Sequence, residues 1–278
     1  MSSGSPRRAV LVSLALLLAA CGDPAERPRS FGGARPVTLQ VPSQFDEHRQ
    51  YPLALVLHGY GANGFVQQAY FGLGDLATRG DAFVLAPDGT VDYSGRQFWN
   101  ADSVCCDFNR LGPDDVGYLG GLIEEVAASW PIDRRAVFAL GHSNGGFMSY
   151  RLACERADLL SAILVLAGDA VMLPCAPARA VSVLHLHGTA DETISYAGAA
   201  PSVTQWAGLD GCTGARAPGD ALDLEAGLAG AETRTESTAG CPAGVAVDLW
   251  TLEGARHVPS FGDAFAPTVW RWLTDHRR

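Results

Sequence analysis

Hydrophobic and polar positions follow two patterns along this chain. Continuous apolar runs, typical of strands buried on both faces of a parallel sheet, occupy residues 53–57, 82–86, 136–140, 162–166 and 181–186. Strict alternation at 37–41 and 247–252 predicts an edge strand and the last strand. Helix-compatible segments cover residues 113–129, 146–153 and 264–276. Strands that alternate with helices predict an α/β fold with a mostly parallel central sheet, helices on both faces and no separate lid domain.

The first twenty residues predict an export signal rather than part of the fold. Arg7 and Arg8 precede an apolar stretch at 9–20 that is too short to span a bilayer as a helix. The segment Leu18-Ala19-Ala20-Cys21 resembles the lipobox of bacterial lipoproteins, in which the cysteine is lipidated and becomes the first residue. An ordinary signal peptide cut nearby is the alternative. We expect a protein secreted to the cell envelope that meets a membrane only through a lipid on Cys21.

The rest of the chain divides into a tether and one domain. Residues 21–35 are rich in Pro, Gly and Arg, which predicts a flexible tether. Residues 36–278 are long enough for one α/β catalytic domain with a full core, which we expect to be a monomer. The formal net charge is −10, and all 20 basic residues are arginine. Because no basic patch is visible, the sequence argues against a nucleic-acid partner.

The cysteine count predicts disulfides. The chain has seven cysteines, at positions 21, 105, 106, 154, 175, 212 and 241. Without the lipidation candidate an even number remains in an exported protein, which favours disulfides but leaves about fifteen possible connectivities. A metal site is the alternative. No cysteine pair has zinc-finger spacing and no H-E-x-x-H motif occurs, so no metal is expected.

Three pairings follow from the positions of these cysteines. Cys212 and Cys241 bracket a polar, Gly-rich stretch, so that a bridge between them would close a long loop. Cys154, on the helix expected at 146–153 or just after it, and Cys175, after the next strand, form a second plausible pair. Elimination leaves the neighbours, the pair Cys105-Cys106.

The segment 141–145 reads Gly-His-Ser-Asn-Gly, a G-x-S-x-G pattern. An apolar run precedes it and a helix-compatible stretch follows it, which is the context of a nucleophile elbow. In such a turn glycine avoids a clash beside the serine, and the serine oxygen is pushed out of the sheet to where a substrate can reach it. The motif also occurs by chance in a chain with 32 glycines, so the flanking strand and helix carry the interpretation. Ser143 is the predicted nucleophile.

A serine nucleophile needs a base and an acid that orients this base. Asp191 lies just past a buried strand, at the sheet edge where ligands bind in open α/β sheets. Asp169, at the end of the preceding strand, is its rival, and Asp191 is preferred because it comes one strand later. His257 lies after the last strand and before the last helix, which suits the base. His185 and His187 are interpreted as packing or loop-holding residues.

An oxyanion hole needs two backbone N–H groups near the nucleophile. One should come from Asn144, the residue after Ser143, and the other from the loop after the early buried strand. That loop begins with His58-Gly59, and Tyr60 is the predicted second donor. The alternative is that the glycines of this loop make a turn and nothing more.

Several motifs together resemble a known family. They are His58-Gly59, Phe98-Trp99-Asn100 with Cys105-Cys106, Asp114-Asp115-Val116-Gly117, the segment 141–146 and His187-Gly188-Thr189-Ala190-Asp191. This set is similar to the esterase family of secreted polyhydroxybutyrate depolymerases and feruloyl esterases. The resemblance implies a serine esterase without metal or cofactor, with Ser143, Asp191 and His257 as its catalytic residues. It also implies that Trp99 lies near the mouth of the site, so Trp99 and His58 are candidate substrate-binding residues, although Trp99 could equally belong to the core.

The expected function is a serine carboxylic-ester hydrolase that acts through an acyl-enzyme on small, oligomeric or polymeric esters. A polyhydroxybutyrate depolymerase is the first expectation, and a feruloyl or acetyl-xylan esterase is the alternative. Family members often carry Trp-Pro soon after the base, whereas this chain has Arg256 before it and Val258-Pro259 after it, which puts the substrate preference in doubt. A peptidase and a non-catalytic binding protein on the same fold are the other hypotheses.

Overall fold

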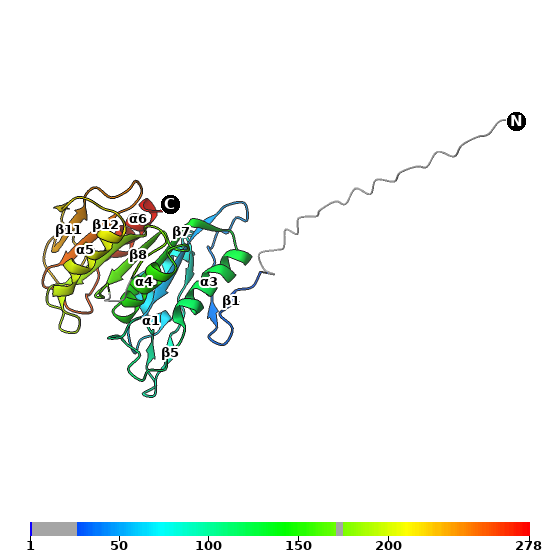
Figure 1. Ribbon diagram of the computed structural model, residues 1–278, viewed down its shortest axis with the longest axis horizontal. Helices are drawn as coiled ribbons and strands as arrows, with labels where there is room; N and C mark the ends of the chain where they lie inside the picture. Colours follow the sequence, from blue (N-terminus) through cyan, green and yellow to red (C-terminus); the bar gives the residue numbers. More distant parts are fainter. Residues whose placement is uncertain (2–26, 171–174) are drawn as a thin grey trace.

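The computed structural model describes Met1, residues 27–170 and residues 175–278. In this part of the chain one eight-stranded sheet runs in the order β10-β11-β12-β9-β8-β7-β3-β4 (Figure 1). Its strands are β3 (Tyr51–Leu57), β4 (Phe83–Leu85), β7 (Ile132–His142), β8 (Ala162–Leu166), β9 (Ser182–Gly188), β10 (Arg216–Pro218), β11 (Thr233–Thr238) and β12 (Val247–Leu252). Every apolar run that was predicted as a buried strand lies in this sheet.

The sheet is mostly parallel, as predicted. All pairs from β4 across to β12 are parallel, and β11 and β10 extend that edge antiparallel. These two outer strands were not predicted, because polar residues in a Gly-rich stretch do not give the signal of a buried strand.

Helices cover both faces of the sheet, which confirms the predicted α/β class (Figure 1). They are α1 (Gly64–Tyr70), α2 (Asp75–Thr78), α3 (Asp115–Ser129), α4 (Asn144–Glu155), α5 (Ala199–Leu209) and α6 (Phe265–Asp275), with a 3-10 turn η1 (Tyr196–Gly198) before α5. Strand β3 shows why two cores form. Leu53, Leu55 and Leu57 belong to the core layer that includes residues of α3, α4 and α5, while Ala54 and Val56 belong to the layer that includes residues of α2 and α6. Side chains alternate across a strand, so a run that is apolar throughout fills both layers.

The N-terminal part of the described chain differs from the expectation. Residues 37–41 do not form an edge strand of the main sheet. Strand β2 (Val37–Thr38) instead pairs with β1 (Ser30–Phe31) in a separate two-stranded sheet, and beyond it Gln40 makes an isolated bridge to Val84. Arg35 forms an ion pair with the buried Asp115 at 2.7 Å. The domain start expected at residue 36 therefore lies inside an ordered stretch, because charge and strand pairing hold residues 30–35 to the domain.

Three disulfides join Cys105 to Cys106, Cys154 to Cys175 and Cys212 to Cys241. All three predicted pairings are confirmed. Such bonds persist in oxidising compartments outside the cytosol, in agreement with an exported protein. The expected signal peptide and Cys21 lie outside the described residues. No helix in the described ranges is both long and apolar enough to cross a membrane.

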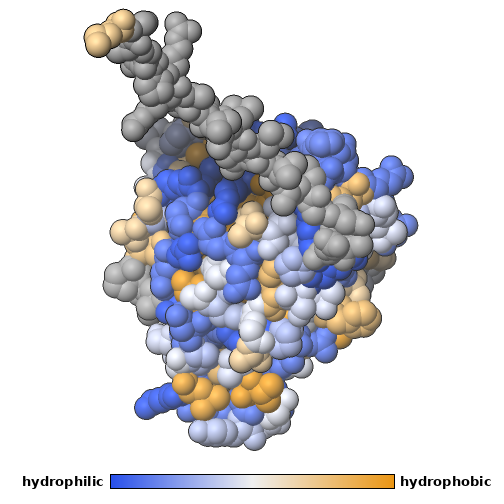
Figure 2. Space-filling model, turned by 90° about the vertical axis from the view of Figure 1, so that its right-hand side faces the viewer, coloured by the Kyte–Doolittle hydropathy of each residue, from blue (hydrophilic) through white to orange (hydrophobic). Residues whose placement is uncertain are grey.

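The surface is unevenly polar. Figure 2 shows a face on which hydrophilic side chains dominate and apolar side chains gather at the lower end, the end at which Figure 1 places β5. Strand β5 (Thr90–Val91) pairs with β6 (Gln97–Phe98) in a short hairpin. Besides Met1, the large apolar side chains that are exposed are Phe65, Val66, Val91, Tyr93, Val104, Phe108 and Val258.

Candidate active site

Ser143 occupies the turn between β7 and α4, as the G-x-S-x-G pattern predicts. Its φ of 52° lies in the left-handed region, which costs energy for a residue with a side chain. Two glycines make this turn possible. A Cβ on Gly141 would overlap the Gly145 carbonyl, and a Cβ on Gly145 would overlap the Leu57 carbonyl. Close backbone approach therefore forces the turn, which presents the serine at the carboxyl end of the strand.

The structure brings together the three side chains predicted for catalysis. His257 Nε2 lies 3.0 Å from Ser143 Oγ, and His257 Nδ1 lies 2.8 Å from Asp191 Oδ2. The His257 side chain is 12% exposed and the Asp191 side chain is 0% exposed, so the base can be reached from solvent and the acid cannot. The rival Asp169 accepts a hydrogen bond from Ser202 instead. This row has the geometry of a nucleophile, a base and an orienting acid.

Hydrogen bonds keep Asp191 ionised in a buried position. Burial alone favours the neutral acid, but hydrogen bonds from His257 and from the backbone N–H groups of Ile194 and Thr193 outweigh it and lower the pKa of Asp191. Both N–H groups lie 2.8 Å from Oδ1. The carboxylate can therefore hold the Nδ1–H tautomer of His257 and stabilise the ring when it gains a proton.

The loop that carries His257 is held by residues that the sequence analysis did not single out. The ring nitrogen Nε2 of His142 donates to the His257 carbonyl at 2.9 Å, and Tyr70 donates to the Pro259 carbonyl at 2.9 Å. Burial lowers the pKa of His142 to about 4, so the ring is neutral at neutral pH. The backbone N–H of His257 also donates to Glu192 at 3.4 Å. A histidine directly before the nucleophile was the available signal for His142.

The loop predicted for the oxyanion hole passes beside the nucleophile. A Cβ built on Gly59 would lie 3.5 Å from the Ser143 Cβ. Within the described chain, no hydrogen-bond acceptor is recorded for the N–H groups of Tyr60 and Asn144. Two free donors beside a serine are what an oxyanion hole requires. Their role remains a prediction.

Trp99 and His58 do not line a substrate pocket, contrary to the expectation. Both residues are 0% exposed. Trp99 Nε1 donates to the His58 carbonyl at 3.1 Å, and the His58 ring accepts a bond from the Gly89 N–H at 2.9 Å. The rings lie 4.9 Å apart beneath the loop that contains Tyr60. Trp99 belongs to the core, as the alternative held, and its indole N–H holds the backbone of His58, two residues before Tyr60.

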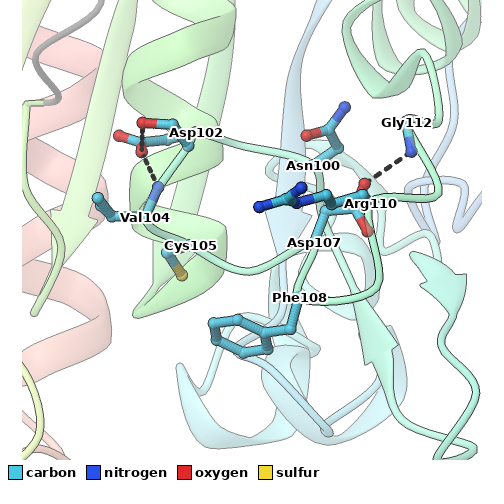
Figure 3. A pocket seen from close by; sticks show the side chains of 9 residues that line it. Asn100, Asp102, Val104, Cys105, Asp107, Phe108, Arg110 and Gly112 are labelled. Atoms are coloured by element: carbon cyan, nitrogen blue, oxygen red, sulfur yellow. Dashed lines mark hydrogen bonds between the residues drawn. The ribbon is translucent and has the colours of Figure 1, made fainter.

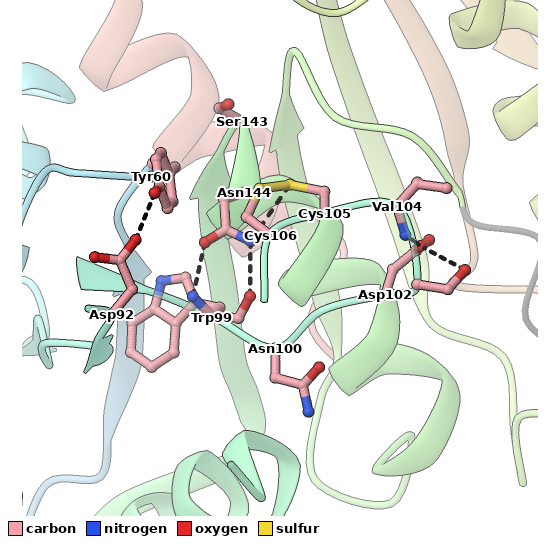
Figure 4. The surroundings of a disulfide bond; sticks show 12 residues. Tyr60, Asp92, Trp99, Asn100, Asp102, Val104, Cys105, Cys106, Ser143 and Asn144 are labelled. Atoms are coloured by element: carbon pink, nitrogen blue, oxygen red, sulfur yellow. Dashed lines mark hydrogen bonds between the residues drawn. A yellow bond between two sulfur atoms is a disulfide. The ribbon is translucent and has the colours of Figure 1, made fainter. Parts of the chain in front are cut away.

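The Asn144 side chain joins the nucleophile elbow to the neighbouring loop (Figure 4). Its Oδ1 accepts from the Trp99 N–H at 2.7 Å, and its Nδ2 donates to the Trp99 carbonyl at 2.9 Å. Nδ2 also lies 3.6 Å from Cys105 Sγ. The disulfide between Cys105 and Cys106 therefore lies against the residue that follows Ser143.

Beyond this disulfide the loop at 100–112 surrounds an open cavity of about 560 Å³ (Figure 3). Val104 and Phe108 line it and are 66% and 63% exposed. The Phe108 ring also meets the Tyr60 ring edge to face, with centroids 5.3 Å apart. Apolar and aromatic side chains thus lie on the rim next to one of the two predicted oxyanion donors.

Comparison with curated proteins finds feruloyl esterases. Feruloyl esterase B of Piromyces equi is 27% identical over 251 residues, which are 82% of this chain and 43% of that protein. Feruloyl esterase D of Neurospora crassa is 28% identical over 261 residues, which are 87% of this chain and 82% of that protein. Feruloyl esterase C of Emericella nidulans is 27% identical over 184 residues, which are 64% of this chain and 63% of that protein. The chain therefore spans under two thirds of the Piromyces and Emericella proteins. No family model matches the chain.

Solved structures share the fold. An acetyl xylan esterase from Aspergillus awamori has a TM-score of 0.61 at 17% identity, over 86% of this chain and 94% of that one. A carboxylesterase from Mesorhizobium loti has a TM-score of 0.59 at 16% identity, over 89% of this chain and 99% of that one. At such identities the similarity establishes the fold. The chain thus shares the α/β-hydrolase fold of these structures, and its similarity to feruloyl esterases comes from the sequence relatives.

Proposed function

We propose that this chain is a serine carboxylic-ester hydrolase in which Ser143 is the nucleophile, His257 the base and Asp191 the orienting acid. One observation carries the proposal. The hydroxyl, the imidazole and the carboxylate lie in a continuous row, with distances of 3.0 Å and 2.8 Å between them. Asp191 comes 48 positions after Ser143 and His257 a further 66 positions later, and each follows a different strand of the parallel sheet.

The reaction follows from this row. Ser143 Oγ attacks the ester carbonyl carbon while His257 Nε2 takes the hydroxyl proton, and the N–H groups of Tyr60 and Asn144 hold the negative oxygen. The C–O bond to the alcohol then breaks, and His257 returns the proton to the leaving oxygen. Water attacks the acyl-enzyme with His257 again as the base, which releases the acid and restores Ser143. Asp191 stays ionised and orients the imidazole throughout.

For the acyl group we favour an aromatic acid, such as the feruloyl group, over a hydroxybutyrate unit. Curated relatives over most of this chain are named feruloyl esterases. The exposed Phe108 ring and the partly buried Tyr60 ring also offer an aromatic surface at the rim. The sequence resemblance to polyhydroxybutyrate depolymerases keeps hydroxybutyrate esters as the competing substrate. Acetylated xylan is a third, since an acetyl xylan esterase has the same fold.

Activity measurements test the proposal. Purified protein should hydrolyse methyl ferulate faster than hydroxybutyrate oligomers or acetylated xylan, and a fluorophosphonate should label Ser143. Ser143→Ala should lower kcat on the order of a millionfold while leaving the circular dichroism spectrum and melting temperature unchanged. An active Ser143→Ala variant would refute the mechanism. Preference for hydroxybutyrate oligomers would refute the substrate assignment alone, and preference for an amide over the matched ester would make the enzyme a peptidase. Absence of both labelling and hydrolysis would favour a binding protein.

We further propose that the mature enzyme is a monomer anchored to the cell envelope through a lipid on Cys21. The small residues before Cys21 support this, and the three disulfides agree with an oxidising compartment. Cells grown with an alkyne fatty acid should label the wild-type protein and not Cys21→Ser, which should appear in the soluble envelope fraction. Equal labelling of both proteins would refute the anchor.

A further inference from the structure

A buried row of side chains continues the catalytic row into the core. Behind Asp191, His187 Nε2 lies 3.2 Å from Asp191 Oδ2 and 3.0 Å from the Ile194 carbonyl. His187 Nδ1 lies 3.2 Å from His185 Nε2, and His185 Nδ1 lies 2.9 Å from the Tyr150 hydroxyl. The two imidazoles stack at 5.5 Å on β9, and Tyr150 comes from α4. His187 therefore contacts the same carboxylate oxygen as His257.

The direction of each hydrogen bond in this row is fixed by the Ile194 carbonyl. A carbonyl oxygen can only accept, so His187 Nε2 carries the hydrogen and donates it to Ile194. Asp191 Oδ2 lies 3.2 Å from the same nitrogen as an electrostatic contact. In a neutral ring the other nitrogen accepts, and His185 must then donate to it from Nε2. His185 Nδ1 is left as an acceptor, which the Tyr150 hydroxyl satisfies. All donors in the row therefore point from Tyr150 toward the Ile194 carbonyl, next to Asp191.

Burial keeps both rings neutral. His185 and His187 are 0% exposed, and this desolvation lowers the pKa of each. A protonated ring would have to place a hydrogen on Nδ1 of His187, where His185 already donates. The row therefore has one arrangement at neutral pH. Its last N–H donates to the Ile194 carbonyl, from a nitrogen that lies 3.2 Å from Asp191 Oδ2.

We propose that His187 is a positioning residue for catalysis, which holds the Asp191 carboxylate in line with His257 and is itself locked as a donor by His185 and Tyr150. The proposal rests on the proposed function, because it assigns the support of that same carboxylate. Two rings that only fill space would not need their four nitrogens satisfied in one direction. The hydrogen bond from His187 fixes Ile194, whose own N–H donates to Asp191 Oδ1 at 2.8 Å. The same His187 nitrogen lies 3.2 Å from Oδ2, the oxygen that accepts from His257, and stabilises its charge electrostatically.

The other charged and titratable groups near this row are few in the described chain. Asp169 acts electrostatically on His187 from the loop after β8, and the Tyr196 ring of η1 meets His187 edge to face at 5.8 Å. On the His257 side, the neutral His142 lies 4.9 Å away between ring centroids, and Glu192 pairs with Arg256 at 3.6 Å in solvent. None of them bonds to Ile194, the residue whose N–H holds Asp191, as His187 does. A change at His187 should therefore alter the pH dependence through Asp191.

Nitrogen NMR of histidine in the wild-type protein tests the row without any mutation. Long-range ¹H–¹⁵N spectra of ¹⁵N-histidine-labelled protein distinguish the two neutral tautomers. We expect His185 and His187 to be Nε2–H tautomers that do not titrate between pH 5 and pH 8. An Nδ1–H tautomer or a protonated ring at His187 in that range would overturn the proposal. Because this readout needs no ester hydrolysis, its outcome is independent of the proposed function.

Two substitutions at one position then test catalysis. His187→Phe keeps a ring but removes the N–H, and should lower kcat about tenfold with little change in KM. The acidic limb of the kcat/KM profile should move to higher pH, because the carboxylate that serves His257 regains negative charge. His187→Gln can keep a terminal N–H toward the Ile194 carbonyl beside Asp191 and should restore most of kcat. Wild-type kcat and an unshifted limb in a folded His187→Phe variant would refute the proposal while the esterase activity stands.

Tyr150→Phe serves if His187→Phe does not fold. It removes the hydroxyl that donates to His185 and should lower kcat about threefold without a change in KM. Tyr51→Phe is the matched control, because Tyr51 is also fully buried and its hydroxyl bonds to the backbone of residues 44 and 46, far from the site. It should lower the urea midpoint and leave kcat unchanged. Equal effects of both substitutions on kcat would refute a role for Tyr150.

Discussion

The two walls of the candidate site are supported in different ways. The wall that carries Asp191 and His257 is supported by completely buried histidines on β9, inside the sheet. The second wall is the loop at 100–112, which meets the elbow at the Asn144 side chain, with a disulfide between neighbouring cysteines beside this contact. It exposes two thirds of its Val104 and Phe108 side chains. The difference suggests a division of labour, in which the core fixes the chemistry and an exposed loop selects the substrate.

Among the substitutions considered for the wall that carries Asp191 and His257, replacing Asp191 should lower kcat most. Asp191→Asn keeps the shape of the side chain but offers a donor where His257 needs an acceptor, so the imidazole loses its correct tautomer. We expect kcat to fall on the order of 10⁴-fold with a similar KM. Steady-state kinetics on methyl ferulate measures it. Asp169→Asn is the control, and a comparable loss of kcat there would mean that the acid has been assigned to the wrong strand.

Truncation of Asn144 should damage the link between the two walls. Asn144→Ala leaves the buried N–H and carbonyl of Trp99 without partners, which should cost roughly 2–4 kcal/mol in the free energy of unfolding and reduce kcat. Asn100→Ala is the matched control, because Asn100 lies on the same loop but bonds to the Pro113 carbonyl and not to the elbow. Urea unfolding and kcat should separate the two variants. If they behave alike, the elbow does not depend on this link.

The sequence also predicted some parts of the site and the sheet better than others. The elbow could be predicted because its tight turn requires glycine at positions where a Cβ would overlap neighbouring backbone, and these glycines are visible in the sequence. Buried strands were predicted from apolar runs. The outer strands β10 and β11 could not be, because polar edge strands in a Gly-rich stretch lack that signal.

Side-chain supports were harder to predict than catalytic residues. A sequence shows which residue types occur after each strand, and this was enough to select Asp191 and His257. It does not show which ring faces which, so Trp99 and His58 were assigned to the substrate although both are buried. The same gap hid His142, whose partner carbonyl belongs to His257, 115 residues later. It also hid the contact between His187 and Asp191, because the sequence does not show how a strand residue and the loop after it face each other.

The stability of the wall that carries His257 should depend on pH through the buried His142. His142 has a pKa of about 4 in the folded protein and about 6.5 when unfolded, so the unfolded chain binds more protons between these values. Stability should be fully present above pH 6.5 and fall by roughly 3 kcal/mol toward pH 4 from this group. His142→Gln, which can still donate to the His257 carbonyl, should show a smaller fall in the urea midpoint. Equal pH slopes in both proteins would contradict the neutral, buried state of His142.

The smallest expected effect is on KM, for a substitution in the loop at 100–112. It tests whether this loop selects the substrate while the core fixes the chemistry. Phe108 is the exposed aromatic that packs on Tyr60, and stacking of an aromatic acyl group on it should be worth about 1 kcal/mol. Phe108→Ala should therefore raise KM for methyl ferulate about fivefold and leave kcat close to the wild-type value. The acetate ester of the same alcohol is the control substrate, because it has no ring to stack and should be hydrolysed with unchanged KM. A loss of kcat on both esters would mean that the rim also positions the oxyanion loop through Tyr60, and the two walls would then share the chemistry.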